Sequence, residues 1–200
     1  RNNMKLESPF FVPFFQEKCE FFDEIKDDLV NHILNKHNKN PFEVQGSYPN
    51  SKTLKQNLTE GDNKLLSSNE EYIERLKKWL MSKTVEVYDS VKIKRNKTIL
   101  GDAWFHVAKK GGFHNIHAHA GVPFGGIFYV DTGNSSVGNT FINPIPGYVD
   151  KNSTQWCSST FKNKAVEGGL IMFPGWILHS AIPHDGDRLR IIIAFNTYYN

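Results

Sequence analysis

The sequence has few cysteines and no long apolar segment. Its two cysteines, Cys19 and Cys157, lie far apart and do not form a disulfide framework. This cysteine usage favours a reducing compartment, so we expect a cytoplasmic location. No apolar run of about 18 residues and no secretory signal pattern occurs, so the sequence predicts no membrane contact.

The sequence also lacks a strong excess of charge of either sign. It has 24 Lys and Arg against 21 Asp and Glu, and the basic residues are scattered. The one basic run, Lys92 to Lys97, is more typical of an exposed strand or turn than of a phosphate contact. We therefore expect a small-molecule substrate and no nucleic-acid partner. A length of 200 residues predicts one domain, residues 1–200.

The first half of the sequence has a helical pattern. Apolar residues recur at helical spacing within residues 22–33, which end before Asn40-Pro41, and again within residues 72–80. Ser68 with Glu71 has the pattern of a capping box that opens the second helix. Between the two helices, residues 42–66 are polar and rich in turn residues.

From about Thr98 the hydrophobic period changes toward two, which is typical of strands. Eight short strands separated by turn residues predict a β-sandwich or jelly roll. The expected strands are 102–108, 113–119, 125–131, 138–142, 157–166, 169–173, 176–183 and 188–199. The predicted fold class is mainly β with N-terminal helices (α+β), in which residues 1–97 support a β-core formed by residues 98–200.

Three histidines suggest a metal site in the β-core. His117 and His119 are two residues apart, so on a strand they would share a face, whereas His114 should point elsewhere. His179 follows a distant apolar run and could complete the site. Imidazole suits several metals, so these ligands alone do not identify the ion.

A hairpin would place an arginine near this site. If Asp185-Gly186 forms a two-residue turn, Ile192 faces His179 and Arg190 lies diagonally about 7–8 Å away on the same face. That separation matches the length of a five-carbon diacid that binds a metal at one end. Arginine can hold the distal carboxylate through a bidentate ion pair. A register slip of one residue would turn Arg190 away.

The residue pattern leaves three candidates for the third metal ligand. Iron oxygenases usually use two histidines and one carboxylate, but His119 occupies the carboxylate position of a His-x-Asp motif. All three histidines could bind the metal. Alternatively, His117 and His179 could bind it together with a water or an anion, while His119 contacts these ligands and not the metal. Asp131, at the end of the next strand, is a third candidate, although a turn role suits it better.

With these residues in view, the sequence resembles the 2-oxoglutarate (2OG)/Fe(II)-dependent oxygenases of the bacterial and phage group that has a His-x-His motif. The resemblance covers about residues 98–197 at the family's spacings. The matching segments are Trp104, His117-Ala-His119, Gly125 to Tyr129, Phe173 to His179, and Arg190 to Asn196.

The resemblance implies a double-stranded β-helix, also called a jelly-roll or cupin-like core. It implies Fe(II) held by His117, His119 and His179, with 2OG bound through Arg190. Further contacts to the co-substrate or pocket are expected from Tyr129, Asn196 and Trp104, while Trp176 and Phe195 are further candidates for the pocket wall. The implied reaction consumes O2, converts 2OG to succinate and oxidises an unactivated C–H bond, with hydroxylation as the default outcome.

Two departures from the family pattern affect binding. Asn143-Pro144-Ile145 replaces a common Asp-Pro-Arg, which bears on a substrate contact. Ile192 stands where many relatives have Ser or Thr, so one hydroxyl contact to the co-substrate is lost.

Two other functions fit the same β-core. A cupin metalloenzyme that does not use 2OG would explain the His-x-His pattern, but the glutamate expected soon after His119 is missing. A non-catalytic jelly-roll module that holds zinc is the second alternative. A homodimer is a further expectation.

Overall fold

The structure is a computed structural model that describes residues 11–39, 57–61, 64–144 and 158–200. Within these residues it has two α-helices, one 3₁₀ turn and ten β-strands in two antiparallel sheets. The helical elements are α1 (Phe22–His37), η1 (Leu65–Ser67) and α2 (Glu71–Ser90). The strands are β1 (Phe15–Lys18), β2 (Leu58–Gly61), β3 (Thr98–Ala108), β4 (His114–His117), β5 (Phe124–Asp131), β6 (Val137–Ile142), β7 (Thr160–Lys164), β8 (Gly169–Pro174), β9 (His179–Ala181) and β10 (Arg190–Tyr199).

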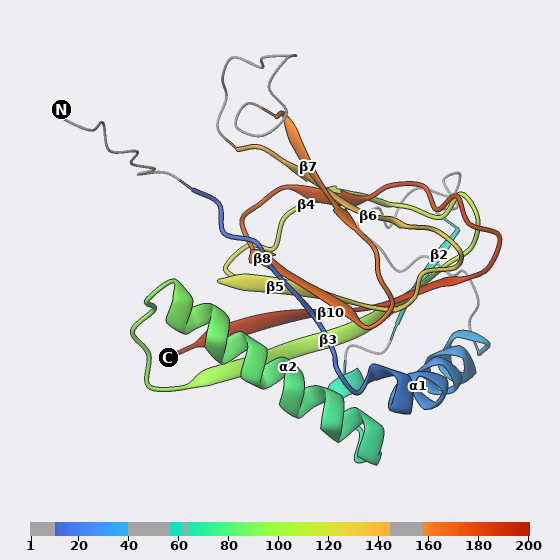
Figure 1. The fold of residues 1–200 in the computed structure, drawn as a ribbon, viewed down its shortest axis with the longest axis horizontal. Helices are drawn as coiled ribbons and strands as arrows, with labels where there is room; N and C mark the ends of the chain where they lie inside the picture. Colours follow the sequence, from blue (N-terminus) through green and yellow to red (C-terminus); the bar gives the residue numbers. More distant parts are fainter. Residues whose placement is uncertain (1–10, 40–56, 62–63, 145–157) are drawn as a thin grey trace, which may run out of the picture.

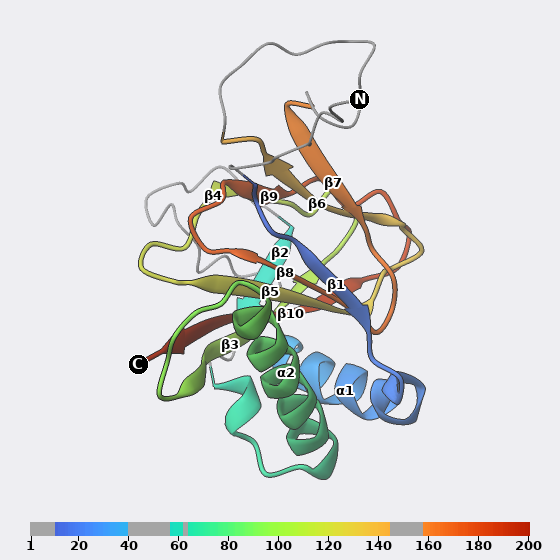
Figure 2. The same cartoon turned by 60° about the vertical axis from the view of Figure 1, so that its left-hand side comes forward.

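The molecule has three layers. The six-stranded sheet, in the order β1-β8-β5-β10-β3-β2, lies between the helices and the four-stranded sheet, in the order β4-β9-β6-β7. Figure 1 shows α1 and α2 below the larger sheet and β4, β6 and β7 above it, and Figure 2 shows the same layers from another side. This arrangement is the jelly-roll architecture expected from the sequence. No helix in the described ranges is long and apolar enough to cross a membrane.

The two faces of the larger sheet have separate hydrophobic cores. On β10, Ile191, Ile193 and Phe195 belong to the core shared with the helices, whereas Ile192 belongs to the core between the sheets. Successive strand residues point to opposite faces, so one strand can supply both cores. The helix-side core includes Phe22 and Leu29 of α1 and Leu76 and Leu80 of α2, all buried.

The strand predictions are confirmed, with shorter bounds for β4, β7 and β9 and an earlier start for β3. Two edge strands, β1 and β2, were not predicted; β2 lies in the segment interpreted as turn-rich. Their burial patterns are one-sided or partial, so they lack the alternation that identifies a strand. The predicted capping box is wrong: α2 begins after Glu70 and no side chain caps it. Parts of the sequence analysis that concern Asn40-Pro41, residues 42–56, Ile145 and Cys157 lie outside the described residues.

The predicted hairpin at Asp185-Gly186 is also wrong. His179 begins β9, which pairs with β4 and β6, while Arg190 begins β10, which pairs with β3 and β5. The segment between them therefore crosses from the smaller sheet to the larger one. Ile192 pairs with His106 and Tyr129 instead of His179.

Candidate metal centre

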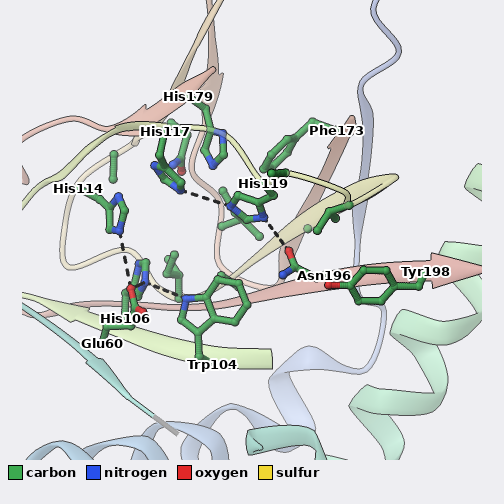
Figure 3. Close-up of a pocket in the computed structure, with 18 residues that line it drawn as sticks. Glu60, Trp104, His106, His114, His117, His119, Phe173, His179, Asn196 and Tyr198 are labelled. Atoms are coloured by element: carbon green, nitrogen blue, oxygen red, sulfur yellow. Dashed lines mark hydrogen bonds and ion pairs between the residues drawn. The ribbon is translucent and has the colours of Figure 1, made fainter. Parts of the chain in front are cut away.

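Three histidines from β4, from the turn after it and from β9 lie close together. His117 ends β4 and pairs directly with His179 at the start of β9, and His119 lies in the turn after β4. One potential ligand atom from each histidine lies within 4.8 Å of the other two. Figure 3 shows the three imidazoles facing one another. The arrangement could hold a metal ion on one side and leave coordination positions open toward the pocket.

Each ring is oriented by a hydrogen bond at Nδ1. His117 Nδ1 lies 2.8 Å from the carbonyl oxygen of Asn115, and His179 Nδ1 lies 3.1 Å from that of Ile177. His119 Nδ1 lies 2.6 Å from the side-chain oxygen of Asn196. All three partners are acceptors, so each Nδ1 carries the proton and each Nε2 keeps its lone pair. Metal-ligating histidines in proteins are typically held in this way.

The facing lone pairs fit a metal ion. His117 Nε2 and His119 Nε2 are only 3.3 Å apart. With both protons on Nδ1, the two Nε2 lone pairs face and repel each other. A cation between them removes this repulsion, because both lone pairs can then coordinate it. Nitrogen ligands at about 2.1 Å from one ion are separated by about 3.0–3.4 Å. The donor set therefore fits a first-row divalent metal such as Fe(II).

Burial keeps the histidines neutral. Desolvation lowers the pKa of His117 to about 4 and that of His179 to about 3, and neighbouring histidines lower both further. Phe173 and Phe141 pack against His179, with ring centroids 4.6 and 5.8 Å away. Neutral imidazole is the form that binds metals, so the rings remain competent ligands down to mildly acidic pH.

Arg190 is a buried cation for which the described part of the chain offers no carboxylate partner. It is 5% exposed, and the described residues supply it with no hydrogen bond or ion pair. By contrast, Arg188, two residues earlier, is exposed and lies 3.2 Å from Asp131. A buried charge is costly unless it is paired, so Arg190 has the properties of an anion-binding group.

Arg190 begins β10, and by strand alternation it shares a face with Ile192, which belongs to the core between the two sheets. Ile192 is flanked by Tyr129 on β5 and His106 on β3. The Tyr129 hydroxyl donates to the side-chain oxygen of Asn139 at 2.9 Å and accepts from the amide nitrogen of Asn163 at 2.9 Å. Burial raises the pKa of Tyr129 to about 12, so the hydroxyl stays neutral.

A cavity of about 360 Å³ connects the histidines with the larger sheet. Trp104, Ile192, Ala194 and Asn196 line it from β3 and β10. Trp176 and Phe195 were further candidates for the pocket wall, but neither lines this cavity. Trp176 is 55% exposed, and Phe195 lies in the helix-side core. Asp131 binds the backbone nitrogen of Gly133 at 2.8 Å and pairs with Arg188, which is a turn role.

Three further polar residues line this cavity, and the sequence did not indicate them as a group. Glu60 from β2, His106 from β3 and His114 from β4 each place one potential ligand atom within 4.8 Å of the other two. The expectation that His114 points elsewhere is wrong, because the pairing of β4 with β9 shifts register between His114 and His117. His114 and His117 therefore lie side by side, with ring centroids 4.2 Å apart. The spacing of His106 two residues after Trp104 was the only local signal available.

Comparison with known families gives one match. Residues 102–196 match a family model described as "Putative 2OG-Fe(II) oxygenase". The matched range contains the three histidines, Arg190 and Asn196. No curated protein matches the sequence.

Comparison with solved structures supports the fold. A prolyl-4-hydroxylase from Pseudomonas putida aligns with a TM-score of 0.62 at 9% identity, over 94% of each chain. HygX from Streptomyces hygroscopicus, solved with nickel and 2-oxoglutarate bound, aligns with a TM-score of 0.62 at 9% identity, over 94% of this chain and 83% of HygX. The viral collagen prolyl hydroxylase vCPH from Paramecium Bursaria Chlorella virus-1, in complex with 2OG, aligns with a TM-score of 0.55 at 18% identity, over 91% of this chain and 94% of vCPH.

Proposed function

We propose that this chain, which belongs to the 2OG-Fe(II) oxygenase family through residues 102–196, oxidises an unactivated C–H bond of a small molecule. It is a 2-oxoglutarate-dependent dioxygenase whose cofactors are Fe(II), 2OG and O2. The proposal adds the reaction outcome and the residues. Hydroxylation, coupled to conversion of 2OG into succinate and CO2, is the outcome we expect first. The observation that carries it is the three-histidine centre together with the buried Arg190, which begins the strand β10 that lines the same cavity and finds no ion-pair partner among the described residues.

We assign the metal to His117, His119 and His179. When bound, Fe(II) supplies the activation of O2 that couples decarboxylation of 2OG to C–H oxidation. The chain's part is to fix the three lone pairs on one point and to keep the rings neutral. Asn196 has a positioning role, since its side-chain oxygen holds the proton of His119 on Nδ1.

We assign the distal carboxylate of 2OG to Arg190. A guanidinium matches a carboxylate in a bidentate geometry, and burial strengthens the pair because water does not screen it. Tyr129 lies close enough to Arg190 to affect its pKa. The Tyr129 hydroxyl is a second candidate contact, because its proton, which it donates to Asn139 in this structure, can turn toward the carboxylate, which only accepts. Ile192 presents an apolar surface to the co-substrate, at the position where the hydroxyl of a Ser or Thr would donate a hydrogen bond to it.

We place the substrate in the part of the cavity lined by Trp104 and Ala120. Its size accommodates a small molecule or one amino-acid side chain at a time. A peptide that contains proline is a second candidate, because two of the similar structures are named prolyl hydroxylases. A homodimer and a cytoplasmic location stay predictions from the sequence.

The decisive experiment measures 2OG turnover directly. Under argon, the ferrous protein with 2OG should show a weak visible charge-transfer band, which a zinc protein cannot show. On admission of O2 it should form succinate, and the His179→Ala variant should show neither signal. Absence of both the band and succinate from folded wild-type protein would favour a cupin without 2OG or a non-catalytic zinc module.

A further inference from the structure

A second set of metal-binding side chains lies beside the three-histidine centre. It consists of Glu60, His106 and His114, which come from three different strands and line the same cavity. His106 and His114 are buried, at 8% and 9% exposure, and their rings stack with centroids 5.3 Å apart. Figure 3 shows these side chains gathered below His117, with Trp104 beside them. The proposed oxygenase reaction assigns none of them a role.

The distances in this cluster suit one shared ion. Glu60 Oε2 lies 2.9 Å from His106 Nε2 and 3.7 Å from His114 Nε2. Ligands about 2.1 Å from an ion are about 3.0 Å apart at a right angle, about 3.4 Å apart at a tetrahedral angle, and never more than about 4.2 Å apart. Both separations fall at or within that limit. Two histidines and one glutamate are also a ligand set that proteins use for zinc and for ferrous iron.

The hydrogen bonding of His106 needs an additional cation or proton. The indole nitrogen of Trp104 donates to His106 Nε2 at 3.0 Å, which requires a lone pair on that nitrogen. Glu60 Oε2, at 2.9 Å from the same nitrogen, requires a proton on it. One nitrogen cannot satisfy both groups. An ion held by Nε2 and Oε2 satisfies both of these atoms, and the indole N–H then donates to solvent in the cavity that Trp104 lines.

His114 also has a nitrogen lone pair that a cation could accept. Its Nδ1 lies 3.2 Å from the carbonyl oxygen of Asn115, which also accepts from His117 Nδ1 at 2.8 Å. A proton on Nδ1 leaves the lone pair of His114 Nε2 facing Glu60. The backbone carbonyl of Asn115 therefore orients two neighbouring rings in the same way, one toward each cluster. This is the arrangement that fixes the tautomer of metal-bound histidines.

We propose that Glu60, His106 and His114 bind a second divalent transition-metal ion, next to the ion of the three-histidine centre. The donor set is borderline in softness, so Zn²⁺ and Fe²⁺ both suit it. Three protein ligands leave coordination positions open toward the shared cavity, where an oxygen or nitrogen atom of a substrate can bind. The competing interpretation is a structural contact in which a protonated histidine pairs with Glu60.

The test counts metal ions in three forms of the full chain after equilibration with Zn²⁺ and removal of free metal. The wild type should hold two equivalents per chain. A Glu60→Gln, His114→Gln variant should hold one, and a His117→Ala, His179→Ala variant should also hold one. The single Glu60→Gln variant should weaken the second site by about 100-fold, and because Glu60 lies on an edge strand it is the variant best suited to keep the fold. Circular dichroism of the metal-free proteins checks folding.

Each outcome separates this inference from the proposed function. If the Glu60→Gln, His114→Gln variant holds as much Zn²⁺ as the wild type, or if the single Glu60→Gln variant binds its second Zn²⁺ as tightly as the wild type does, the cluster is a structural contact and the inference is wrong. If the His117→Ala, His179→Ala variant binds none, the inference is also wrong. If that variant binds one equivalent and the wild type binds no more, the second site stands and the proposed three-histidine centre fails. Co²⁺ absorption provides a second readout, since loss of Glu60 should change the visible spectrum of only one of two bound ions.

Discussion

The two faces of the six-stranded sheet carry different kinds of residue although they share the same strands. The face toward the helices packs apolar side chains of β3, β5, β8 and β10 against α1 and α2. The face toward the smaller sheet buries Arg190, Tyr129 and His106 among a smaller set of apolar groups. The helix side therefore contributes most of the apolar burial that stabilises the fold. The side between the sheets accepts costly polar burial, which an ion or an anionic ligand can offset.

This difference predicts that stability and ligand binding separate by face. A substitution on the helix side should change the free energy of unfolding and leave ligand affinity alone. A substitution between the sheets should change ligand affinity and leave the free energy of unfolding nearly unchanged. Neighbouring residues of one strand provide the strongest comparison, because the backbone and the position in the sheet stay the same.

The largest effect is expected for Phe128→Ala on the helix side. Phe128 is fully buried and packs against Phe22 and Trp79, with ring centroids 5.7 and 6.0 Å away. Loss of a buried phenyl ring should lower the free energy of unfolding by about 3–5 kcal/mol, measured by urea denaturation. Phe161→Ala is the control, since Phe161 is 38% exposed, and it should cost much less. A change of more than tenfold in the 2OG affinity of folded Phe128→Ala would break the separation of the faces.

The next effect is expected for Arg190→Ala. Removal of the buried guanidinium should raise the Kd for 2OG by at least about 100-fold, because hydrogen bonds to charged groups contribute up to about 3 kcal/mol. Arg188→Ala is the matched control, since Arg188 is on the same segment but exposed and paired with Asp131. Calorimetric titration with 2OG measures both. Equal affinities of Arg190→Ala and Arg188→Ala would remove the co-substrate assignment while leaving the metal centre intact.

Cys19 tests the apolar character of the helix side through its acid–base chemistry. Burial raises the pKa of Cys19 from 9.0 to about 11. At pH 8 the thiolate fraction should therefore fall by about 100-fold, and reaction with a thiol reagent should slow accordingly. The folded state keeps the proton that the unfolded state loses, so stability should decline as pH rises from about 9 to 11.

The Cys19 measurement should use a Cys157→Ser background, so that one thiol is followed. Unfolding in guanidinium provides the fully reactive reference, and a Cys19→Ala variant should lose the alkaline decline in stability. Native reactivity equal to that of the unfolded chain would mean that this edge of the helix side opens readily.

The smallest effect is expected for Asn196→Ala. Loss of the acceptor for His119 should weaken metal binding by about tenfold, as is typical when a partner of a ligating histidine is removed. Asn115→Ala is the control, because Asn115 holds His117 through its backbone carbonyl, which the substitution preserves. Competition with a chelator measures both affinities. A larger loss for Asn115→Ala than for Asn196→Ala would contradict the positioning role of Asn196.

Much of the fold was predictable because its signals are local. The alternation along residues 188–199 identified β10 and also indicated that Asn196 shares a face with Arg190, while Phe195 points the other way. The structure agrees, with Phe195 in the helix-side core and Asn196 at the cavity. The edge strands β1 and β2 were missed, since their pairing partners β8 and β3 are more than 40 residues away and provide no local pattern.

The site was predictable only in part. His117 and His119 were paired by their spacing, His179 was added because it follows a distant apolar run, and the family resemblance implied all three as ligands; the structure brings their rings together. Arg190 was expected beside them on the basis of a hairpin that does not exist; it lies instead on β10 of the larger sheet, whereas His179 lies on β9 of the smaller one. Glu60 and His106 could not be grouped with His114, because their proximity depends on the pairing of β2 with β3 and on the approach of the two sheets.

The sequence by itself determined the alternation of each strand, the apolar faces of both helices and the ring types available for a metal. These follow from the period of two along a strand and 3.6 along a helix, which act between neighbours in the chain. The tertiary structure decided which strands became partners, and thereby which distant histidines share one cavity with the carboxylate of Glu60. Such pairing depends on burial and hydrogen bonding between segments far apart in sequence, and a local register shift, as between His114 and His117, changes which side chains meet.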